Sequence, residues 1–520
     1  MKRRFKHSVF VFAFAALVVG FFLPLVISAS KRSAEWFSPR TVLAAPVDAR
    51  SSGVGSLLAV FRVGAGIHAS LTTNCTLYAA ANGNDSNSGT SPSSPKTLQG
   101  AANATSPGSV VCLLAGRYEL SQEFAPSISG THSAWITYEA YNDGPPYLVW
   151  TGSKDSVPMI IIDGTKYPNI QNIAFQGLYL DGQGSALSGF QCKSANGINF
   201  IANTVVDTDG AGVVANGCDY VISDHNLIMH NGYSAGASNT SGISYGMVPW
   251  ADSYTGVHNA ISNNIIVGEV DQSATPTDGN GIILDLPYGS NTTTPPALIL
   301  NNIVYGNGGR CIETNQYVTN FWIVNNSCYK NALNIPSQQT YPEIQQQLNT
   351  SMTGINGVIA NNISYSWTSS NPPYEQDNPS SNPGITYTEN LYFGGACKPS
   401  ALCNGFINAD PQFVTPPYFD PSASGQYAFG RPPLPGRPIY EPTTRCAVSG
   451  TSGWIPTCDI DSGFALASTS PGYGNIGVDP TTLTTNTNIQ ADLRTYVYND
   501  INGNPRGGST GKWDLGAYQH

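Results

Sequence analysis

The sequence predicts a right-handed parallel β-helix, an all-β solenoid, and a recurring asparagine is the first observation that predicts it. Seven short apolar segments each begin with Asn, and they are Asn203-Thr-Val-Val, Asn226-Leu-Ile-Met, Asn264-Ile-Ile-Val, Asn302-Ile-Val-Tyr, Asn326-Ser-Cys-Tyr, Asn362-Ile-Ser-Tyr and Asn390-Leu-Tyr-Phe. Gly177-Leu-Tyr-Leu precedes them without the Asn. In a solenoid, identical positions of successive coils stack about 4.8 Å apart, so the side-chain amides can hydrogen-bond from coil to coil. An Asn at a tight turn can also adopt left-handed backbone geometry.

The spacing of the repeats is the second observation. The shorter intervals suit one coil, and the longer ones fit the same coil with about 12–15 inserted residues. Inserted loops of a solenoid usually gather on one face and often build its binding site. The repeat therefore predicts that Val205, Ile228, Ile266 and Val304 form one internal column.

The amino-terminal segment predicts export. A basic stretch, Met1-Lys-Arg-Arg, precedes an apolar run from Val9 to Ile27 and the small residues Ser28-Ala29-Ser30. We interpret residues 1–30 as a signal peptide; an uncleaved membrane anchor is the alternative, because the run is long enough to span a bilayer. Either way the rest of the chain is expected to be secreted or displayed at the cell surface.

Cysteine usage agrees with export. Ten cysteines favour disulfides over metal ligation in an exported chain. Equal offsets from Gly177 and Asn203 predict a Cys192–Cys218 bond, and proximity predicts Cys75–Cys112, Cys397–Cys403 and Cys446–Cys458. Cys311 and Cys328 remain as the last pair.

The chain divides into four expected parts. A linker at 31–73 precedes the β-helix at 74–400, whose first strand is Leu77-Tyr-Ala and whose open end a short helix near 96–104 can cap. Residues 401–520 are rich in proline and glycine and are expected to pack on the last coil. The net charge of −10, without a basic stripe, excludes nucleic acid as a partner, and we expect a monomer.

Three segments carry a family resemblance. Tyr78-Ala-Ala-Ala-Asn-Gly-Asn-Asp-Ser-Asn-Ser-Gly-Thr, Lys96-Thr-Leu-Gln and Leu114-Ala-Gly-Arg-Tyr resemble the N-terminal part of pectate-lyase-superfamily β-helices, above all the family-9 polysaccharide lyases and their bacterial relatives. The resemblance implies the fold. It leaves the reaction open, because that superfamily holds lyases, hydrolases, epimerases and non-catalytic proteins.

A first candidate site is a calcium site. Asp181, Asp207 and His230 each follow a ladder position by four residues, and Asp209 follows Asp207 by two. Carboxylates stacked on adjacent coils suit Ca²⁺, and the family resemblance implies such a cation. We therefore predict that Asp181, Asp207 and Asp209 bind Ca²⁺; solvated turn residues are the alternative.

A second candidate site is catalytic. Arg310 is the only arginine between residues 118 and 430, and alignment of the strands places it beside Asn280. A lyase acting on uronates needs a base and a positive group that stabilises an enolate. The predicted catalytic residues are Arg310, Asp278, Asp285, Glu313 and His230. A structural Arg–carboxylate pair is the alternative.

Aromatic residues in the long insertions suggest a groove for sugars, with aromatic packing of loops as the alternative. The predicted substrate-binding residues are Tyr233, Tyr245, Trp250, Tyr254, His258 and Tyr288. The sequence thus predicts a secreted polysaccharide-active protein, in the first place a calcium-assisted lyase of a uronate-containing glycan. A glycoside hydrolase and a non-catalytic glycan-binding or adhesion protein are the alternatives.

Overall fold

The computed structural model describes residues 74–141, 143–154, 157–232, 240–246, 248–272, 277–285, 293–333, 341–348, 354–377, 384–416, 462–507, 511 and 513–519. It also gives the backbone of two short antiparallel ribbons, β1–β2 (Phe61–Val63, Gly66–His68) and β33–β34 (Ala447–Val448, Pro456–Thr457). The expected signal peptide, the Cys446–Cys458 pair and most of the expected linker lie outside these residues.

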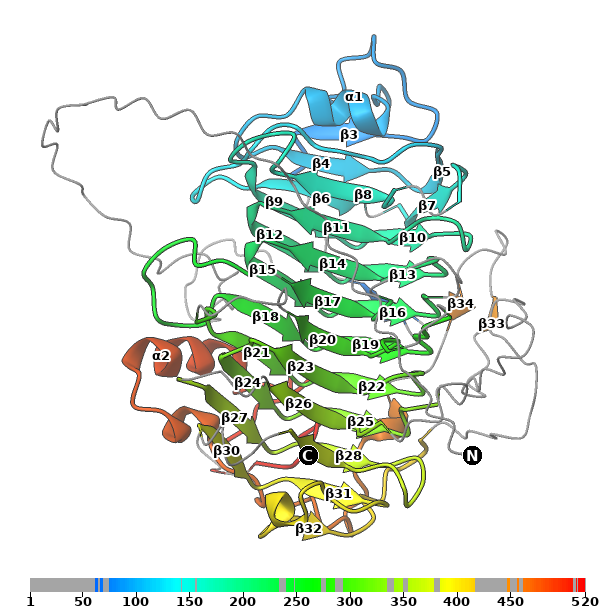
Figure 1. The fold of residues 1–520 in the computed structure, drawn as a ribbon. Helices are drawn as coiled ribbons and strands as arrows, with labels where there is room; N and C mark the ends of the chain where they lie inside the picture. The colour runs from blue at the N-terminus through cyan, green and yellow to red at the C-terminus, as the bar shows by residue number, and fades with distance from the viewer. Residues whose placement is uncertain are drawn as a thin grey trace, which may run out of the picture. The chain divides into compact units, whose positions relative to one another are not determined.

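Three parallel sheets form the body of the protein and confirm the predicted parallel β-helix (Figure 1). We call them sheets I, II and III. Sheet I has eleven strands: β5 (Gly116–Leu120), β7 (Pro146–Trp150), β10 (Tyr179–Asp181), β13 (Thr204–Val206), β16 (Leu227–Met229), β19 (Ile265–Val267), β22 (Ile303–Tyr305), β25 (Ser327–Tyr329), β28 (Ile363–Tyr365), β31 (Leu391–Phe393) and β32 (Ile407–Asn408). Sheet II has eight: β8 (Ile160–Asp163), β11 (Phe190–Lys193), β14 (Val213–Asn216), β17 (Ile243–Gly246), β20 (Ile282–Asp285), β23 (Ile312–Gln316), β26 (Ile344–Leu348) and β29 (Tyr374–Gln376).

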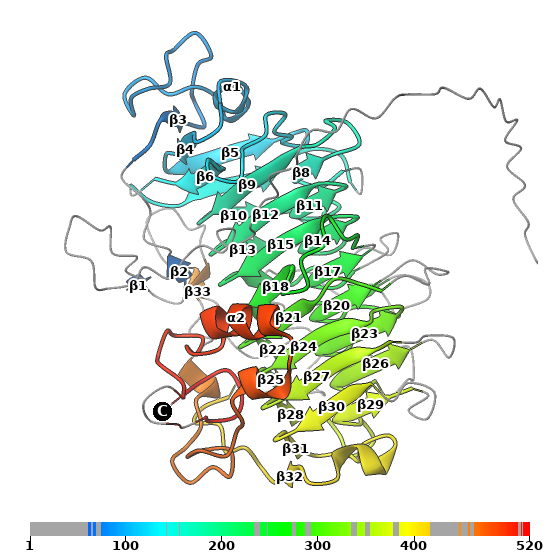
Figure 2. The same cartoon turned by 90° about the vertical axis from the view of Figure 1, so that its left-hand side faces the viewer.

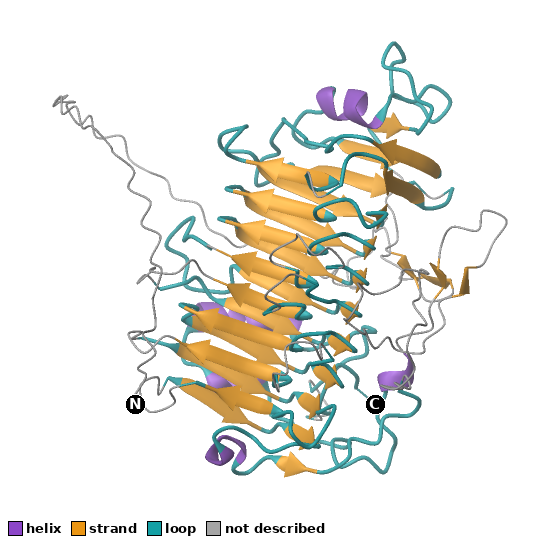
Figure 3. Cartoon of the chain, turned by 45° about the vertical axis from the view of Figure 1, so that its right-hand side comes forward, coloured by secondary structure: helices purple, strands orange, loops and turns teal. Residues whose placement is uncertain are grey.

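Sheet III has eleven strands: β3 (Leu77–Ala79), β4 (Val110–Leu113), β6 (Ile136–Ala140), β9 (Gln171–Gln176), β12 (Asn196–Ile201), β15 (Asp219–Asp224), β18 (Asn259–Ser262), β21 (Ala297–Leu300), β24 (Asn320–Val324), β27 (Asn356–Ala360) and β30 (Ile385–Thr388). Each full coil runs from sheet III to sheet I to sheet II, and Figure 3 shows the strands stacked coil on coil. The remaining described elements are α1 (Leu98–Asn103), α2 (Thr487–Tyr496) and three short 3-10 helices, η2 (Ser400–Cys403), η3 (Ser462–Phe464) and η4 (Pro480–Leu483).

The interior is built from aligned apolar columns. Val205 pairs with Ile228, Ile228 with Ile266, and Ile266 with Val304 in sheet I. All four side chains are fully buried, so the predicted internal column is confirmed. Helix α1, capped by the side chain of Thr97, packs Leu98, Ala101 and Ala102 onto the first coil, as the sequence predicts.

A continuous asparagine ladder runs along the corner between sheets III and I. In each of its six links the Nδ2 group donates to the Oδ1 atom of the next Asn at 2.9–3.2 Å, from Asn203 to Asn390. The backbone N–H of the same residue donates to the same Oδ1 at 2.9 Å. Because every member is buried, these bonds replace those that water would otherwise make.

Two details of this corner differ from the sequence prediction. The left-handed backbone geometry belongs to the residue before each ladder Asn, for example Ala202 (φ 52°), Asn263 (φ 56°) and Asn361 (φ 60°). Gly177 (φ 69°) shares that position, and Tyr179 pairs with Thr204, so Leu178 stands where the next coil has Asn203. The coil that contains β10 is therefore shifted by one residue from the predicted alignment.

A second buried ladder follows sheet I. Asn231 donates to Glu269 Oε1 at 3.1 Å, and the N–H of Glu269 donates to Asn307 Oδ1 at 2.9 Å. Asn307 donates to Asn331 Oδ1 at 2.8 Å, and Asn331 donates to Glu343 at 2.7 Å. Burial raises the pKa of both Glu269 and Glu343 to about 8. Two carboxyl groups thus replace amides inside a polar ladder.

Four disulfides join residues of the described chain: Cys75–Cys112, Cys192–Cys218, Cys311–Cys328 and Cys397–Cys403. All four were predicted. The reason given for Cys192–Cys218 was wrong, however, because Cys192 pairs with Ala215 in sheet II and the two cysteines are not register partners.

The described residues of the carboxy-terminal region beyond residue 461 pack along the coils. Asn361 Nδ2 donates to Val478 O at 2.7 Å, and Asn301 Nδ2 donates to Asn499 O at 2.8 Å. The N–H of Ala517 donates to the Ser327 hydroxyl at 3.0 Å. Figure 2 shows α2 beside the sheet III strands. No helix among the described residues is long and apolar enough to cross a membrane.

We predict that Asn264→Ala lowers the free energy of unfolding by about 3–5 kcal/mol. The change removes the acceptor of the backbone N–H and Nδ2 groups of Asn226 and the Nδ2 donor to the Ser223 carbonyl, and Asn302 Oδ1 loses one of its two donors. Urea denaturation measures the loss. The neighbouring Asn263→Gly, which keeps the left-handed turn at a half-buried position, is the control and is expected to cost about 1 kcal/mol. Equal losses in the two variants would contradict a special role for the ladder.

We predict opposite effects for two isosteric changes in the second ladder. Glu269 Oε2 is buried with no hydrogen-bond partner within the described chain, so Glu269→Gln is tolerated and stays neutral at every pH. A raised carboxyl pKa makes stability fall as pH rises from about 4.5 to 8, so this variant gains about 2–4 kcal/mol near pH 9 and little near pH 5. Glu343 accepts from Asn331 with both oxygens, so Glu343→Gln is expected to destabilise near pH 5 and, because the pKa of Glu343 is raised as well, to destabilise less near pH 9. Thermal melts at the two pH values test the pair.

Candidate functional site

The outer faces of the three sheets differ in chemistry. On sheet I, outward residues such as Tyr305 and Ile363 pack with Phe464, Leu515 and Ala517 of the carboxy-terminal segment. On sheet III, Leu298 and Trp322 pack with the α2 residues Ile489 and Leu493 and with others of the same segment. Sheet II belongs to neither cluster, and its outer face carries polar and charged residues. Sheet II is therefore the face on which a ligand site can lie.

Side-chain alternation builds the charged columns of sheet II. Ile312 faces the core and is fully buried, so Glu313 faces outward, as predicted. In strand pairing Glu313 aligns with Gln345, and Gln345 aligns with Glu375. Asp285 lies in the neighbouring column, where Asn315 donates to it at 2.8 Å.

Arg310 is the centre of this face. Its NH1 group lies 3.2 Å from Glu313 Oε2 and donates to the Thr277 carbonyl at 3.1 Å, and its Nε donates to Gln345. Its guanidinium carbon lies 4.3 Å from the ring centre of Tyr341, a cation–π distance. The backbone N–H of Arg310 donates to Asn280 Oδ1 at 2.8 Å, which confirms the predicted neighbour. Arg310 is only 8% exposed.

Asp278 joins this cluster from the loop between β19 and β20. Its pKa is raised to about 7, chiefly by burial and then by the charges of Glu313, Asp271 and Asp285, while Arg310 lowers it. Asp271 shapes the loop, because its Oδ2 accepts the N–H groups of Thr277 and Asp278 at 2.8 and 3.1 Å.

Glu313 is the second carboxyl with a perturbed pKa in this cluster. Burial raises its pKa, Arg310 lowers it, and Asn280 Nδ2 donates to its Oε2 at 2.8 Å. The cluster thus contains one carboxyl poised near neutrality among other carboxylates, which is an arrangement suited to acid–base chemistry. Four predicted catalytic residues, Arg310, Asp278, Asp285 and Glu313, are brought together.

His230, the fifth, lies elsewhere. It occupies the left-handed turn after β16 (φ 58°), and its Nε2 lies 3.2 Å from the position that a Cβ of Gly268 would take on the next coil. Asp207 (φ 59°) and Gly268 (φ 72°) share this turn column, so His230 is a turn residue in the structure.

The residues of the predicted aromatic groove do not lie together. Tyr245 is an inward residue of β17, 1% exposed, and donates to Ser223 Oγ at 2.8 Å, so it cannot contact a glycan. This correction follows from strand alternation, because Tyr245 shares the parity of the core residue Ile243. Tyr233 and Tyr288 lie outside the described residues.

Trp250, Tyr254 and His258 gather over sheet III. The His258 ring stacks on Tyr220 at 4.3 Å and meets Trp250 at 5.0 Å. Its Nδ1 lies 2.8 Å from Asp219 and its Nε2 lies 2.7 Å from the Tyr254 carbonyl. The Tyr254 hydroxyl and the Val257 N–H donate to Asp492 of α2 at 3.0 and 2.7 Å. Tyr254 and the loop before His258 therefore dock the carboxy-terminal helix in the structure.

The structure places the predicted calcium ligands in separate contacts. Asp181 pairs with Val206, one position away from Asp207, and accepts bonds from Tyr147 at 2.6 Å and from the Gln183 N–H at 2.9 Å. Asp209 is buried and lies 3.4 Å from Lys154. Within the described chain, three potential ligand groups come together only at Cys75–Cys112–Glu139 and Cys311–Cys328–Glu343, where the cysteines are oxidised. Calcium binding stays a prediction, and we derive no step through it.

Several residues of the cluster were not predicted. Asn280 and Gln345 hold Glu313 and Arg310, and Glu375 with Lys398, 2.9 Å apart, extends the column. The strand alignment that selected Glu313 could have found Gln345 and Glu375 by counting one and two coils further. Asp271 carries no such signal, because its contact is made within an irregular loop.

The comparisons with known proteins came out as follows. No family model matches the chain, and no curated protein matches it. Among solved structures, the pectate lyase Pel9A is similar with 16% identity and a TM-score of 0.47, over 87% of this chain and 98% of that one. An alginate lyase from Paenibacillus sp. has 16% identity and a TM-score of 0.38, over 64% of this chain and 97% of that one.

A surface protein is also similar. The Streptococcus pneumoniae surface protein and adhesin PfbA shares 14% identity at a TM-score of 0.42, over 58% of this chain and 82% of that one.

We predict that two substitutions move the pKa of Asp278 in opposite directions. Arg310→Met removes a positive charge and raises it above 7, whereas Glu313→Gln removes a negative charge and lowers it. Carbon-13 NMR titration of the Asp278 carboxyl measures both shifts. Lys398→Met, which changes a charge outside the influences on Asp278, is the control. Shifts of the same sign in the two variants would contradict the cluster described above.

Proposed function

We propose that this protein is a secreted, polysaccharide-active enzyme that binds an extended glycan on the outer face of sheet II and cleaves it with the Asp278–Glu313–Arg310 cluster. The observation that carries the proposal is Asp278, a half-buried carboxyl with a pKa of about 7 among neighbouring carboxylates, on the outer face that the described carboxy-terminal clusters leave free. The four disulfides support an extracellular location.

The charge of the face favours a neutral glycan. Asp271, Asp278, Asp285, Glu313 and Glu375 lie in or beside the site. Among the described residues, the cations that pair with these carboxylates are Arg310 and Lys398. Both cations are already paired with carboxylates, at 3.2 and 2.9 Å. A polyanionic chain would be repelled by this surface, whereas a neutral sugar can donate its hydroxyls to the carboxylates.

Hydrolysis is the reaction that these groups suit best. Glycoside hydrolysis needs one protonated carboxyl to donate a proton to the leaving oxygen and one carboxylate to act as base or nucleophile. Asp278 is protonated below about pH 7 and takes the acid role. Asp285, held by Asn315 and at the end of β20, takes the carboxylate role. Glu313 and Arg310 set the charge around both.

β-Elimination on a uronate polymer is the second candidate, and Arg310 is the observation that favours it. A guanidinium at the centre of the face could neutralise a uronate carboxylate and stabilise the enolate. The carboxylates around it oppose this role unless a cation accompanies the substrate. The two reactions differ in product: elimination gives an unsaturated sugar that absorbs in the ultraviolet, and hydrolysis gives only a new reducing end.

We predict that Asp278→Asn lowers kcat by about 10²–10⁴-fold on the glycan that the wild-type protein cleaves, with little change in binding. In the wild type, kcat falls as pH rises through about 7, because Asp278 loses its proton there, and the residual activity of the variant lacks this limb. Screening the purified protein on neutral and uronate glycans, by reducing-end and ultraviolet assays with and without a chelator, finds the substrate.

His230→Asn, which changes the distant turn column, is the control and is expected to keep full activity. Ultraviolet-absorbing products would show that the reaction is elimination and would contradict the proposed hydrolysis. If the protein binds glycans but cleaves none of those screened, it is a glycan-binding protein and the proposed enzymatic function is wrong.

A further inference from the structure

One interior column of the solenoid consists of glycines that cannot be replaced. Gly189, Gly212, Gly242 and Gly281 immediately precede four successive strands of sheet II, and backbone bonds align them coil by coil. A Cβ added at these glycines would lie 2.3, 2.4, 2.6 and 2.2 Å from side-chain atoms of Val205, Ile228, Ile266 and Val304, in that order. The corner is therefore closed by glycine against a β-branched residue of the following coil.

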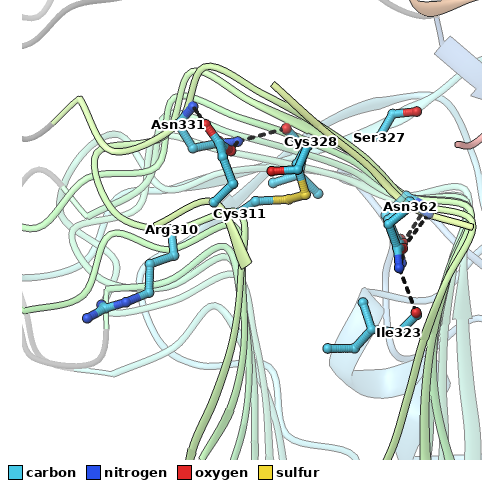
Figure 4. Close-up of a disulfide and its surroundings, with 12 residues drawn as sticks. Arg310, Cys311, Ile323, Ser327, Cys328, Asn331 and Asn362 are labelled. Atoms are coloured by element: carbon cyan, nitrogen blue, oxygen red, sulfur yellow. Dashed lines mark hydrogen bonds between the residues drawn. A yellow bond between two sulfur atoms is a disulfide. The ribbon is translucent and has the colours of Figure 1, made fainter. Parts of the chain in front are cut away.

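The next coil uses a disulfide at the same place. Cys311 continues the glycine column, because the Ile282 N–H donates to its carbonyl at 2.9 Å, and Cys328 continues the β-branched column, because it pairs with Val304. A covalent bond thus replaces the contact between glycine and valine or isoleucine. Figure 4 shows this bond inside the corner, with Arg310 extending away from it.

The position of this bond matters because Arg310 is bonded directly to Cys311. Cys311 and Ile312 are both fully buried at this corner, while the side chains of Arg310 and Glu313 lie on its outer side, 3.2 Å apart. The other described disulfides lie elsewhere: near the first coil, between β11 and the residue before β15, and beside η2. The coil that carries the candidate catalytic arginine is thus the one in which the corner is cross-linked.

We propose that the Cys311–Cys328 disulfide is a positioning element that fixes the backbone under Arg310 and so holds its guanidinium against Glu313, Gln345 and Tyr341. The proposal rests on the function proposed above as far as catalysis is concerned. The bond anchors residue 311 from the inside, while Asn280 and Glu343 hold the neighbouring backbone N–H groups of Arg310 and Cys311. An arginine held in this way loses less conformational entropy when the site binds its substrate.

The columns themselves supply the test variant. Cys311→Gly with Cys328→Val restores the pair found at Gly281 and Val304, so packing is kept and only the covalent bond is lost. Cys192→Ala with Cys218→Ala is the matched control: it removes another interior disulfide, and Ala215 already aligns with Cys192. Should the first variant fail to fold, Cys311→Ala with Cys328→Ala removes the bond without a new clash.

Two readouts separate positioning from general stability. The first is the rate at which phenylglyoxal modifies Arg310, followed by peptide mass spectrometry under native conditions; we expect about a tenfold increase in the Cys311/Cys328 variant and no change in the control. The second is steady-state kinetics, where we expect kcat to fall about tenfold with KM nearly unchanged. Both variants are expected to lose thermal stability.

Each outcome decides something. Equal Arg310 modification rates in wild type and the Cys311/Cys328 variant would overturn the positioning role, whatever the activity. If the Cys311/Cys328 variant shows faster modification of Arg310 but an unchanged kcat, the disulfide positions Arg310 but this positioning does not matter for catalysis. If the wild-type protein cleaves no glycan, the proposed function fails, and the modification rates still decide whether the disulfide holds Arg310.

Discussion

The hydrogen bond from one asparagine amide to the next is the interaction on which the rest of the structure depends. A coil of this length cannot bury its apolar residues alone, so each must be held in register with its neighbours. The ladder sets that register, because a slip by one residue would leave two buried bonds per Asn unmade and turn the core residues outward. Sheet II inherits its alignment from this corner. The charged columns around Arg310 are therefore aligned by residues on the far side of the core.

The distribution of charge follows from the same architecture. Only 11% of the residues are charged, and few of them are basic. The outer faces of sheets I and III are apolar where the carboxy-terminal segment covers them, so ionised groups there would be buried without solvent. Within the described part of the chain, the carboxy-terminal segment does not cover sheet II in this way, and the outward column of sheet II holds Glu313, Gln345 and Glu375. The chemistry of the site is possible because the third face is the one left for polar side chains.

Much of the fold could be predicted from the sequence, because the repeat encodes it. The ladder Asn and the column from Val205 to Val304 are visible as period and pattern. Two of the observed disulfides, Cys75–Cys112 and Cys397–Cys403, followed from proximity in the sequence. The predicted alignment of the coil that contains β10 was wrong by one residue, because Leu178 replaces the Asn that would have marked its register. The cluster of Arg310, Asp278, Asp285 and Glu313 could be predicted because three of its members lie on or beside aligned strands.

Other parts of the site depend on contacts that no period records. The role of Asp271 comes from a loop contact, and the docking of Tyr254 onto Asp492 joins residues 238 positions apart in the chain. The aromatic groove was misread for this reason: rings in an insertion are as suitable for packing a helix as for binding a sugar, and only the tertiary structure decides. Tyr245 shows the simpler error, since the strand extends further than the insertion was assumed to allow.

The returning carboxy-terminal segment changes how the protein can fold. A simple solenoid is stabilised by neighbouring coils and can grow or fray one repeat at a time. Here Val478 and Asn499 contact Asn361 and Asn301, about 120 and 200 positions earlier, so the contact order is far higher than that of the coils alone. The outer faces of sheets I and III stay exposed until the last residues of the chain have been synthesised. A chain truncated near residue 460 would present two broad apolar surfaces, and aggregation, more than loss of the coils, would be its fate.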